Sequence, residues 1–370
     1  MNDCDSSDRA SEAPVEKSVG ESAGLVPQCL FSTNLPELLE RMPASLFATT
    51  YQAGRLMVAR PLDGRISLLM RKFDQPMGMA IEPRRMLLGT RTEIIQFANA
   101  PDIAAQLEPA GRYDGCFVPR QRRITGDISS HELDWDAEDR PLVVNTRFSC
   151  LCTLDDAYSL RPTWQPPFVS KLAAEDRCHL NGLAMVDGKP KYVTALGQTD
   201  KAGGWREGKA TGGVLVDVES GELVAHGLSM PHSPMVTGGR IWLLDSGTGR
   251  LVTVDRATGA VETVATLPGY ARGLDIVGGL AFVGLSKIRE TSTFGGIPIA
   301  ERRNELKCGV WVVDLKSGET IAFAEFTSGV TEIFDVKLLR GVRFPEVVGC
   351  DQDMIRGIYI VPDSVGVDDG

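Results

Sequence analysis

Three of the four histidines in the chain lie at the start of short apolar segments, in similar places of a recurring pattern. His131, His179 and His232 are 48 and then 53 positions apart, and Arg272 and Glu332 hold a similar place in two later segments. Neutral imidazole is a common ligand of Zn and Fe, and three histidines with a carboxylate leave one position open for a substrate. The pattern therefore predicts that the histidines bind a divalent metal ion (Zn, Fe or Mn), with Glu332 as fourth ligand or general base and Arg272 as a catalytic group that holds an anion.

A bound metal ion would lower the pKa of a water ligand toward neutrality and supply a nucleophile. We therefore expect an enzyme that acts on a small polar or anionic substrate by hydrolysis or elimination. Two alternatives stay open. The histidines could serve as acid and base without a metal, or the polar ring could lock the fold of a non-catalytic ligand-binding or scaffolding protein. An oxygen-activating iron enzyme would need a fourth histidine where this chain has Glu332.

Two polar pairs are expected to hold these groups in place. The adjacent Asp176 and Arg177 are expected to pair with each other and to fix the loop around them. An arginine at the mouth of a channel must pair with a carboxylate or accept a substrate anion, so Asp275 or Asp335 is expected beside Arg272.

The segments that carry these residues belong to a repeat of short strands. Helical spacing of apolar residues is confined to residues 35–42, whereas strand-like runs of four to eight residues recur throughout. Each unit has a polar start, a first strand, and then further strands. Three of the third strands end in Asp-to-Gly turns that are typical of hairpins. The first strands are expected at 76–81, 131–135, 180–185, 233–236, 272–277 and 332–338.

The two ends of the chain hold complementary parts of one unit. Residues 332–338 look like a first strand with too little chain after it, and residues 46–72 look like second, third and fourth strands without a first. Joining the ends completes a ring of units. The sequence therefore predicts an all-β chain that folds as a six-bladed β-propeller closed by its N- and C-terminal strands, with seven blades as the alternative. We expect residues 28–363 to form this single domain, and residues 1–27 and 364–370 to be disordered.

A propeller would bring the polar starts of the first strands together around the axis, although they are distant in sequence. Two long connections, 198–211 and 288–307, would overhang the same face, and long loops on a compact scaffold are often binding elements. Side chains in these connections and in a shorter one are expected to clamp an anionic or planar substrate. The predicted substrate-binding residues are Asn145, Arg147, Trp205, Arg206 and Arg289.

Two sets of phrases resemble known families. The stretch NGLAM followed by DGKPKYVTA is similar to a phrase of the gluconolactonase, strictosidine synthase and NHL-repeat propellers. This resemblance implies a six-bladed propeller and a metal-site role for Asn181, which we therefore include among the catalytic residues. That family binds Ca through an oxygen-rich site, and the histidines depart from it, so Ca is less expected than Zn, Fe or Mn. Phrases such as NTRFSCL, MPHSP and EIFDV, across residues 45–345, resemble a family of bacterial conserved-hypothetical propellers without assigned activity.

Composition excludes several other classes of protein. With 39 basic and 49 acidic residues the net charge is -10, which disfavours nucleic acid and anionic membranes as partners. The eight cysteines form no CxxC pair, so reduced thiols are expected, with a catalytic thiolate at Cys178 as a minor alternative. The N-terminal segment has no apolar core of a signal peptide, and no apolar run is long enough to span a membrane. We expect a cytoplasmic protein with a small-molecule substrate, and the sequence does not identify a protein partner.

Overall fold

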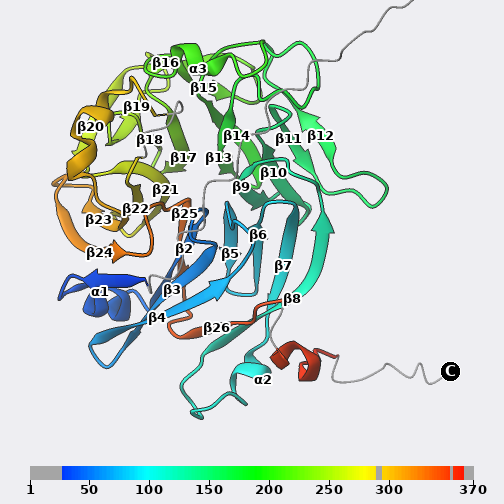
Figure 1. The fold of residues 1–370 in the computed structure, drawn as a ribbon, viewed down its shortest axis with the longest axis vertical. Helices are drawn as coiled ribbons and strands as arrows, with labels where there is room; N and C mark the ends of the chain where they lie inside the picture. Colours follow the sequence, from blue (N-terminus) through cyan, green and yellow to red (C-terminus); the bar gives the residue numbers. More distant parts are fainter. Residues whose placement is uncertain (1–26, 289–293, 351–352, 362–370) are drawn as a thin grey trace, which may run out of the picture.

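The computed structural model describes residues 27–288, 294–350 and 353–361 of the chain. These residues form six small sheets around a central axis, so the prediction of a six-bladed β-propeller is confirmed (Figure 1). We number the sheets blades 1 to 6 along the chain. The segments predicted to be disordered, 1–27 and 364–370, lie outside the described residues apart from residue 27.

Blades 1 to 5 each use four consecutive antiparallel strands, which follow one another from the axis outward. Blade 1 consists of β5 (Met79–Glu82), β6 (Arg85–Gly89), β7 (Glu93–Asn99) and β8 (Gly115–Ile124). Blade 2 consists of β9 (Ser130–Trp135), β10 (Pro141–Asn145), β11 (Cys150–Thr153) and β12 (Arg161–Trp164). Blade 3 consists of β13 (Leu180–Val186), β14 (Lys189–Ala195), β15 (Gly213–Asp217) and β16 (Leu223–Leu228).

The next two blades repeat this order. Blade 4 consists of β17 (Pro231–Thr237), β18 (Arg240–Asp245), β19 (Arg250–Val254) and β20 (Val261–Thr266). Blade 5 consists of β21 (Tyr270–Val277), β22 (Leu280–Ser286), β23 (Gly309–Asp314) and β24 (Thr320–Ser328). The middle strands are almost fully buried because neighbouring blades cover both of their faces, which explains why they read as continuous apolar runs rather than as alternating patterns.

Blade 6 joins the two ends of the chain, as predicted. Its innermost strand is β25 (Asp335–Arg340), and its outer strands are β2 (Ala44–Thr50), β3 (Arg55–Leu62) and β4 (Arg65–Lys72). In the antiparallel pairing of β25 with β2, Leu338 lies opposite Leu46. Backbone hydrogen bonds between these distant segments therefore complete the sixth blade and close the ring.

Two short strands that we did not predict extend the outer edges of the propeller. The strand β1 (Gln28–Phe31) pairs with β24 in blade 5, and β26 (Pro345–Val347) pairs in parallel with β8 in blade 1. The helix α1 (Leu35–Arg41) forms where the apolar spacing predicts it and buries Leu35 and Leu39. The other helical segments are short: α2 (Pro101–Ala104), α3 (Trp205–Gly208), η1 (Pro298–Glu305) and η2 (Asp353–Gly357). Within the described ranges no helix has the length and apolar character needed to cross a membrane.

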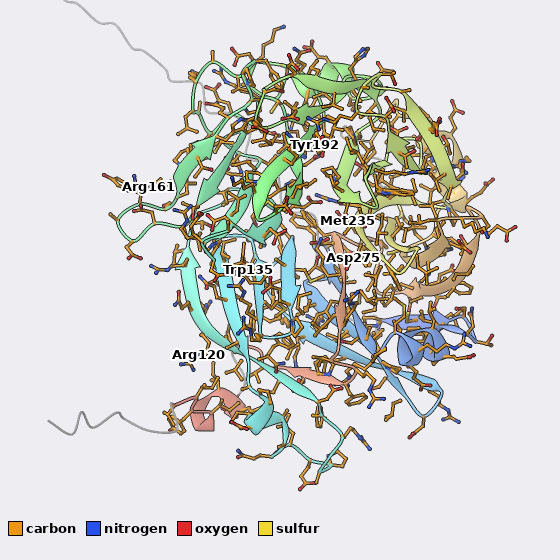
Figure 2. All side chains as sticks on the ribbon, turned by 180° about the vertical axis from the view of Figure 1, so that it is seen from behind. Arg120, Trp135, Arg161, Tyr192, Met235 and Asp275 are labelled. Atoms are coloured by element: carbon orange, nitrogen blue, oxygen red, sulfur yellow. The ribbon has the colours of Figure 1, made fainter. Side chains whose placement is uncertain are left out.

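Side chains fill the spaces between blades and around the axis. In Figure 2, Met235 and Asp275, on the innermost strands β17 and β21, lie near the axis, whereas Arg120 and Arg161, on the outermost strands β8 and β12, lie at the periphery. The innermost strands approach one another closely at Gly78. A Cβ atom there would lie 1.6 Å from the carbonyl oxygen of His131, so only glycine fits beside the strand that carries this histidine.

Candidate functional site

A cavity opens on the face of the propeller where the innermost strands begin. Its volume is about 330 Å³, and side chains from all six blades line it. Residues that precede or begin the innermost strands of successive blades contribute Gln75, Ser129, His179, His232, Arg272 and Glu332. The structure therefore brings together residues that are up to about 260 positions apart in the sequence, as the propeller geometry predicts.

The three predicted histidines meet in this cavity. The ring centroids of His131 and His179 are 5.0 Å apart, and those of His131 and His232 are 6.4 Å apart. Their places in the blades differ. His131 and His232 are the second residues of β9 and β17, but the second residue of β13 is Asn181, and His179 lies in the loop before that strand with a positive φ of 52°.

The tautomer of His131 follows from its hydrogen bonds. Its Nδ1 atom lies 3.0 Å from the carbonyl oxygen of Ser129 and 2.7 Å from Oγ1 of Thr146. A carbonyl oxygen only accepts, and Thr146 donates its hydroxyl hydrogen to the carbonyl oxygen of Leu180, so Nδ1 of His131 must carry the proton. The unprotonated nitrogen of this ring is therefore Nε2.

His232 is held in the same way. Its Nδ1 atom donates to the carbonyl oxygen of Met230 at 2.9 Å and lies 3.0 Å from Oγ of Ser246. Burial lowers the pKa of His131 and of His232 well below the ordinary histidine value, and the positive charge of Arg272 lowers both further. Both imidazoles are thus neutral at physiological pH, with Nε2 as an acceptor.

His179 has a different partner from the other two histidines. Its Nδ1 atom lies 3.0 Å and 3.1 Å from the two carboxylate oxygens of Asp176, and Nε1 of Trp205 donates to the same carboxylate at 3.0 Å. The predicted pairing of Asp176 with Arg177 is wrong, because Arg177 instead forms ion pairs with Glu175 and Asp200. Asp176 is left to orient the imidazole, a role that the sequence reasoning missed.

Arg272 lines the cavity and contacts three other residues of its wall. Its Nη2 atom donates to Nε2 of His131 at 2.8 Å, and its guanidinium carbon lies 3.6 Å from the ring centroid of Phe334. Its Nη1 atom is 3.4 Å from Oε1 of Glu332, which is a long ion pair. Its buried Nε atom has no hydrogen-bond partner among the described residues. Burial lowers the pKa of this guanidinium, and the carboxylate of Glu332 partly offsets that effect.

The partner predicted for Arg272 was wrong. Asp335 accepts a hydrogen bond from the backbone nitrogen of Met79 at 2.9 Å, and Asp275 accepts one from the backbone nitrogen of Leu338 at 2.7 Å. Each carboxylate links its own innermost strand to the innermost strand of the next blade. These two aspartates therefore join blades, and Glu332 is the carboxylate beside Arg272.

Asn181 and Asn145 are predicted site residues that are buried and lie outside the cavity lining. The amide of Asn181 donates to the carbonyl oxygen of Pro231 at 3.0 Å and accepts from Thr194 at 2.7 Å, so it joins blades 3 and 4. Asn145 is fully buried, and its side-chain oxygen accepts a hydrogen bond from the backbone nitrogen of Phe148 in the turn after β10. Both amides have structural hydrogen bonds in this arrangement.

The predicted substrate-binding residues are divided between the cavity and the surface around it. Trp205 lines the cavity, and its ring centroid lies 4.5 Å from that of His179. Arg206 stacks on Trp205 but leaves 52% of its side chain exposed, and Arg147 pairs with Asp127 at 3.3 Å beside the mouth. Arg289 lies outside the described residues.

The cavity also has an aromatic wall that the sequence reasoning missed. It contains Tyr51, Tyr270, Phe294 and Phe334 in addition to Trp205. A signal was present in the sequence, because Tyr270 and Phe334 each lie two residues from a predicted site residue. The alternative of a thiolate at Cys178 is not supported, since burial raises the pKa of this thiol to about 12.

The proposed metal ligands do not share a free coordination position in this arrangement. Nε2 of His131 already accepts a hydrogen bond from Arg272, whose positive charge lies where a metal ion would bind. Across the described ranges, no group of three or more His, Cys, Asp or Glu side chains is placed to hold a metal ion. Metal binding by His131, His179 and His232 stays a prediction, and it requires Arg272 to turn away.

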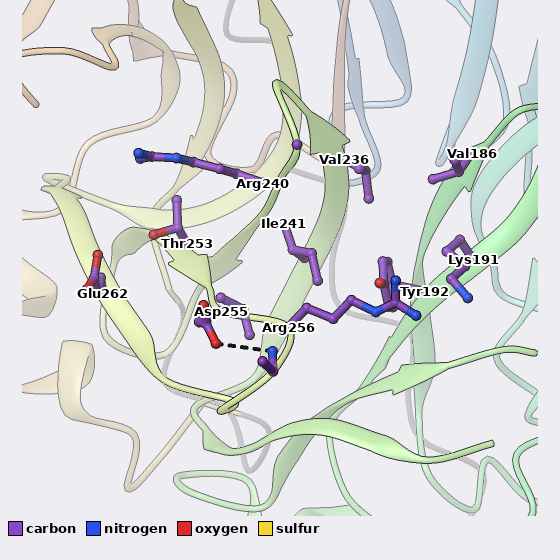
Figure 3. Close-up of a pocket in the computed structure, with 13 residues that line it drawn as sticks. Val186, Lys191, Tyr192, Val236, Arg240, Ile241, Thr253, Asp255, Arg256 and Glu262 are labelled. Atoms are coloured by element: carbon purple, nitrogen blue, oxygen red, sulfur yellow. Dashed lines mark hydrogen bonds between the residues drawn. The ribbon is translucent and has the colours of Figure 1, made fainter. Parts of the chain in front are cut away.

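A second, larger cavity of about 560 Å³ lies between blades 3 and 4, where the innermost strands end (Figure 3). Figure 3 shows the side chain of Arg256 extending across it toward Tyr192. The buried carboxylate of Asp217 lies 2.9 Å from Lys191 and 3.8 Å from Arg256, so these two cations already share an internal partner. The charges of this second cavity are thus largely balanced, and none of the histidines lines it.

Comparisons with known proteins agree with this fold. No curated protein sequence matches the chain. A chain in a crystal structure of a nidogen/laminin complex is similar to it, with a TM-score of 0.51 and 12% sequence identity over 80% of this chain and 97% of that chain. At this identity the likeness supports the fold alone. A family model described as a domain of unknown function matches residues 33–348, so the expected kinship with propellers of unassigned activity is confirmed. The chain belongs to the DUF4915 family.

Proposed function

We propose that the cavity is the active site of an enzyme that transfers a proton on a small anionic molecule during hydrolysis or elimination. The observation that carries this proposal is the hydrogen bond of 3.0 Å between Nδ1 of His179 and the carboxylate of Asp176, at the wall of a cavity that also holds Arg272. A carboxylate on Nδ1 orients the imidazole and stabilises the imidazolium that forms when Nε2 takes a proton. His179 is therefore the acid and base of this proposal.

The other two histidines support binding rather than proton transfer. Their pKa values are too low for them to hold a proton near neutral pH, so each offers Nε2 as a hydrogen-bond acceptor. In His131 this acceptor holds the guanidinium of Arg272 in place. In His232 it remains for a hydroxyl or amide hydrogen of the substrate.

Arg272 supplies the anion-binding group. A guanidinium has five N–H donors. In the described part of the chain, Nε of Arg272 is buried without a partner, and the nearest carboxylate oxygen, on Glu332, is 3.4 Å from Nη1. A substrate anion in the cavity would accept hydrogen bonds from this guanidinium in competition with Glu332. In an elimination, Arg272 would stabilise the charge that develops when His179 removes a proton beside the bound anion.

A screen for conversion of small molecules tests the proposal. The full chain is incubated in D2O with hydroxy acids, unsaturated acids, esters and lactones, and proton NMR follows bond cleavage and loss of C–H signals. For any compound that is converted, we expect His179→Gln to reduce the rate by about a hundredfold or more. His226→Gln, in the exposed outer strand β16, is the matched control and should leave the rate unchanged.

The alternative of a non-catalytic protein makes a different prediction in the same experiment. Binding of a compound without conversion, unchanged in His179→Gln, would favour a ligand-binding propeller. Conversion that persists in His179→Gln would contradict the role of His179 as acid and base.

A further inference from the structure

Ring side chains form about half of the cavity wall. The chain has only 13 Phe, 6 Tyr and 5 Trp residues, and five of these side chains line this one cavity together with three of the four histidines. Aromatic side chains could instead have been spread through the cores between blades, where most large apolar residues of this chain are aliphatic. Their concentration around the histidines indicates that the cavity is shaped for a ligand with flat faces.

The rings contact one another along the wall. The ring centroids of Tyr51 and Phe334 are 6.2 Å apart, and those of Phe334 and His131 are 5.2 Å apart. On the other side, the centroids of Tyr270 and Phe294 are 5.2 Å apart, and that of Tyr270 is 5.8 Å from His232. These contacts hold each ring in one orientation, so a planar ligand would meet preformed faces rather than flexible side chains.

One charged group with unused donors lies among these rings. Arg272 is stacked on Phe334, and its Nε atom is buried without a partner in the described part of the chain. Among the described residues, Glu332 is the carboxylate nearest to Arg272, but the separation of 3.4 Å leaves the pair weaker than a close bidentate one. A planar carboxylate can bind a guanidinium edge to edge and keep its attached ring in the same plane.

We propose that the ligand of this cavity is a small aromatic carboxylate, whose carboxylate binds Arg272 and whose ring packs between the aromatic side chains. This inference rests on the proposed function only in using the same cavity, because it concerns recognition and not proton transfer. It narrows the ligand from any small anion to one with an aromatic ring.

An aromatic cage beside a carboxylate could also suit an organic cation. In this cavity, however, the guanidinium of Arg272 already covers the face of Phe334 at 3.6 Å and pairs with Glu332. A second cation would meet the charge of Arg272 at the same place. The arrangement therefore favours an anion.

Four matched compounds test the inference on the full chain. Calorimetry in a buffer of low chloride measures the binding of benzoate, cyclohexanecarboxylate, benzamide and benzyltrimethylammonium. We expect benzoate to bind, cyclohexanecarboxylate to bind about threefold to tenfold more weakly because it cannot stack, and benzamide to bind at least about tenfold more weakly because it has no charge. The ammonium compound should not bind.

Variants distinguish recognition by Arg272 from a general loss of structure. Arg272→Lys should weaken benzoate binding by about tenfold or more, since lysine lacks the planar pair of donors. Glu332→Gln should tighten it several-fold, because the variant removes the carboxylate that competes for Arg272. A gain of affinity in Glu332→Gln is an outcome that damage to the fold would not produce.

Three outcomes would overturn the inference. Equal binding of benzoate and cyclohexanecarboxylate would show that the cavity does not select for an aromatic ring. Tighter binding of the ammonium compound than of benzoate would show that the cavity prefers a cation. Failure of all four compounds to bind would show that the cavity does not recognise this class of ligand. Benzoate binding in a protein that converts none of the screened compounds would contradict the proposed catalysis and leave this inference standing.

Discussion

Nη2 of Arg272 and Nε2 of His131 are 2.8 Å apart, and the arginine donates this hydrogen bond to a neutral histidine. The bond is possible because the proton of His131 is on Nδ1, where it is donated to the carbonyl oxygen of Ser129. A permanent cation is thereby held against an acceptor that does not neutralise its charge. The pair keeps His131 neutral and leaves Arg272 available for an anion.

Removal of the guanidinium should raise the pKa values of the neighbouring histidines. After burial, the charge of Arg272 is the largest cause that lowers the pKa of both His131 and His232. We expect both values to rise in Arg272→Met while staying below 6.5, because burial remains. NMR titration of the imidazole protons measures this, with Arg256→Met in the second cavity as the control. Unchanged values in Arg272→Met would mean that the charge does not act on these rings.

The buried histidines should make the folded protein less stable in mild acid. The pKa of His232 is below 6.5 in the folded protein, so only the unfolded chain takes up a proton there as the pH falls below 6.5, and the free energy of unfolding decreases. In His232→Gln the loss of unfolding free energy for each unit that the pH falls should be smaller than in the wild type, by up to about 1.4 kcal/mol. Glu132, whose pKa burial raises to about 7, acts in the opposite direction in both proteins.

Urea unfolding at a series of pH values between about 7 and 5 tests this expectation. Comparing the variant with the wild type cancels the contribution of Glu132 and of other groups that titrate in both. His226→Gln controls for the loss of an imidazole from an exposed position. Parallel pH profiles for wild type and His232→Gln would contradict the lowered pKa.

A methyl group at Gly78 should disturb the strand that carries His131. The added Cβ would lie 1.6 Å from the carbonyl oxygen of His131 and 2.7 Å from its carbonyl carbon, both backbone atoms that cannot turn aside. We expect Gly78→Ala to destabilise the protein by about 3 kcal/mol or more, at the upper end of the range for overpacking. In Gly208→Ala the new Cβ would meet nothing within 4 Å, so the free energy of unfolding should change little. Similar stability of the two variants in denaturant unfolding would argue against close approach of the innermost strands.

The metal hypothesis can be separated from the acid–base proposal by metal analysis. In protein purified without a histidine tag, we expect less than one equivalent of Zn, Fe or Mn, because Arg272 occupies Nε2 of His131. Arg272→Met should bind added Zn more tightly than the wild type, since it frees this imidazole and removes a positive charge. Stoichiometric metal in the wild type that is lost in His179→Ala and His232→Ala would instead support a metal-dependent enzyme.

The architecture of this protein could be predicted from the sequence because the sequence features that determine it are local and recur in every blade. Each blade is encoded by short apolar strands and turns within one unit, and the incomplete units at residues 46–72 and 332–338 complement each other, which predicts closure. The same repeat predicts that His131, His179 and His232 converge, since residues at the start of innermost strands meet at the axis. The short strands β1 and β26 were missed because they add to the outer edges of blades and belong to no repeat.

The pairings inside the cavity depended on the tertiary structure. Asp176 and Arg177 are adjacent and of opposite charge, yet each side chain points to a different partner, because the positive φ of Asp176 and the position of Trp205 bring its carboxylate to His179. Likewise, Glu332 rather than Asp335 lies beside Arg272, although both are acidic and lie at or just before the start of β25. A repeat specifies which residues come to the axis. The direction of each side chain there depends on backbone angles and on neighbours from other blades. Neither can be predicted from the spacing of residues along the chain.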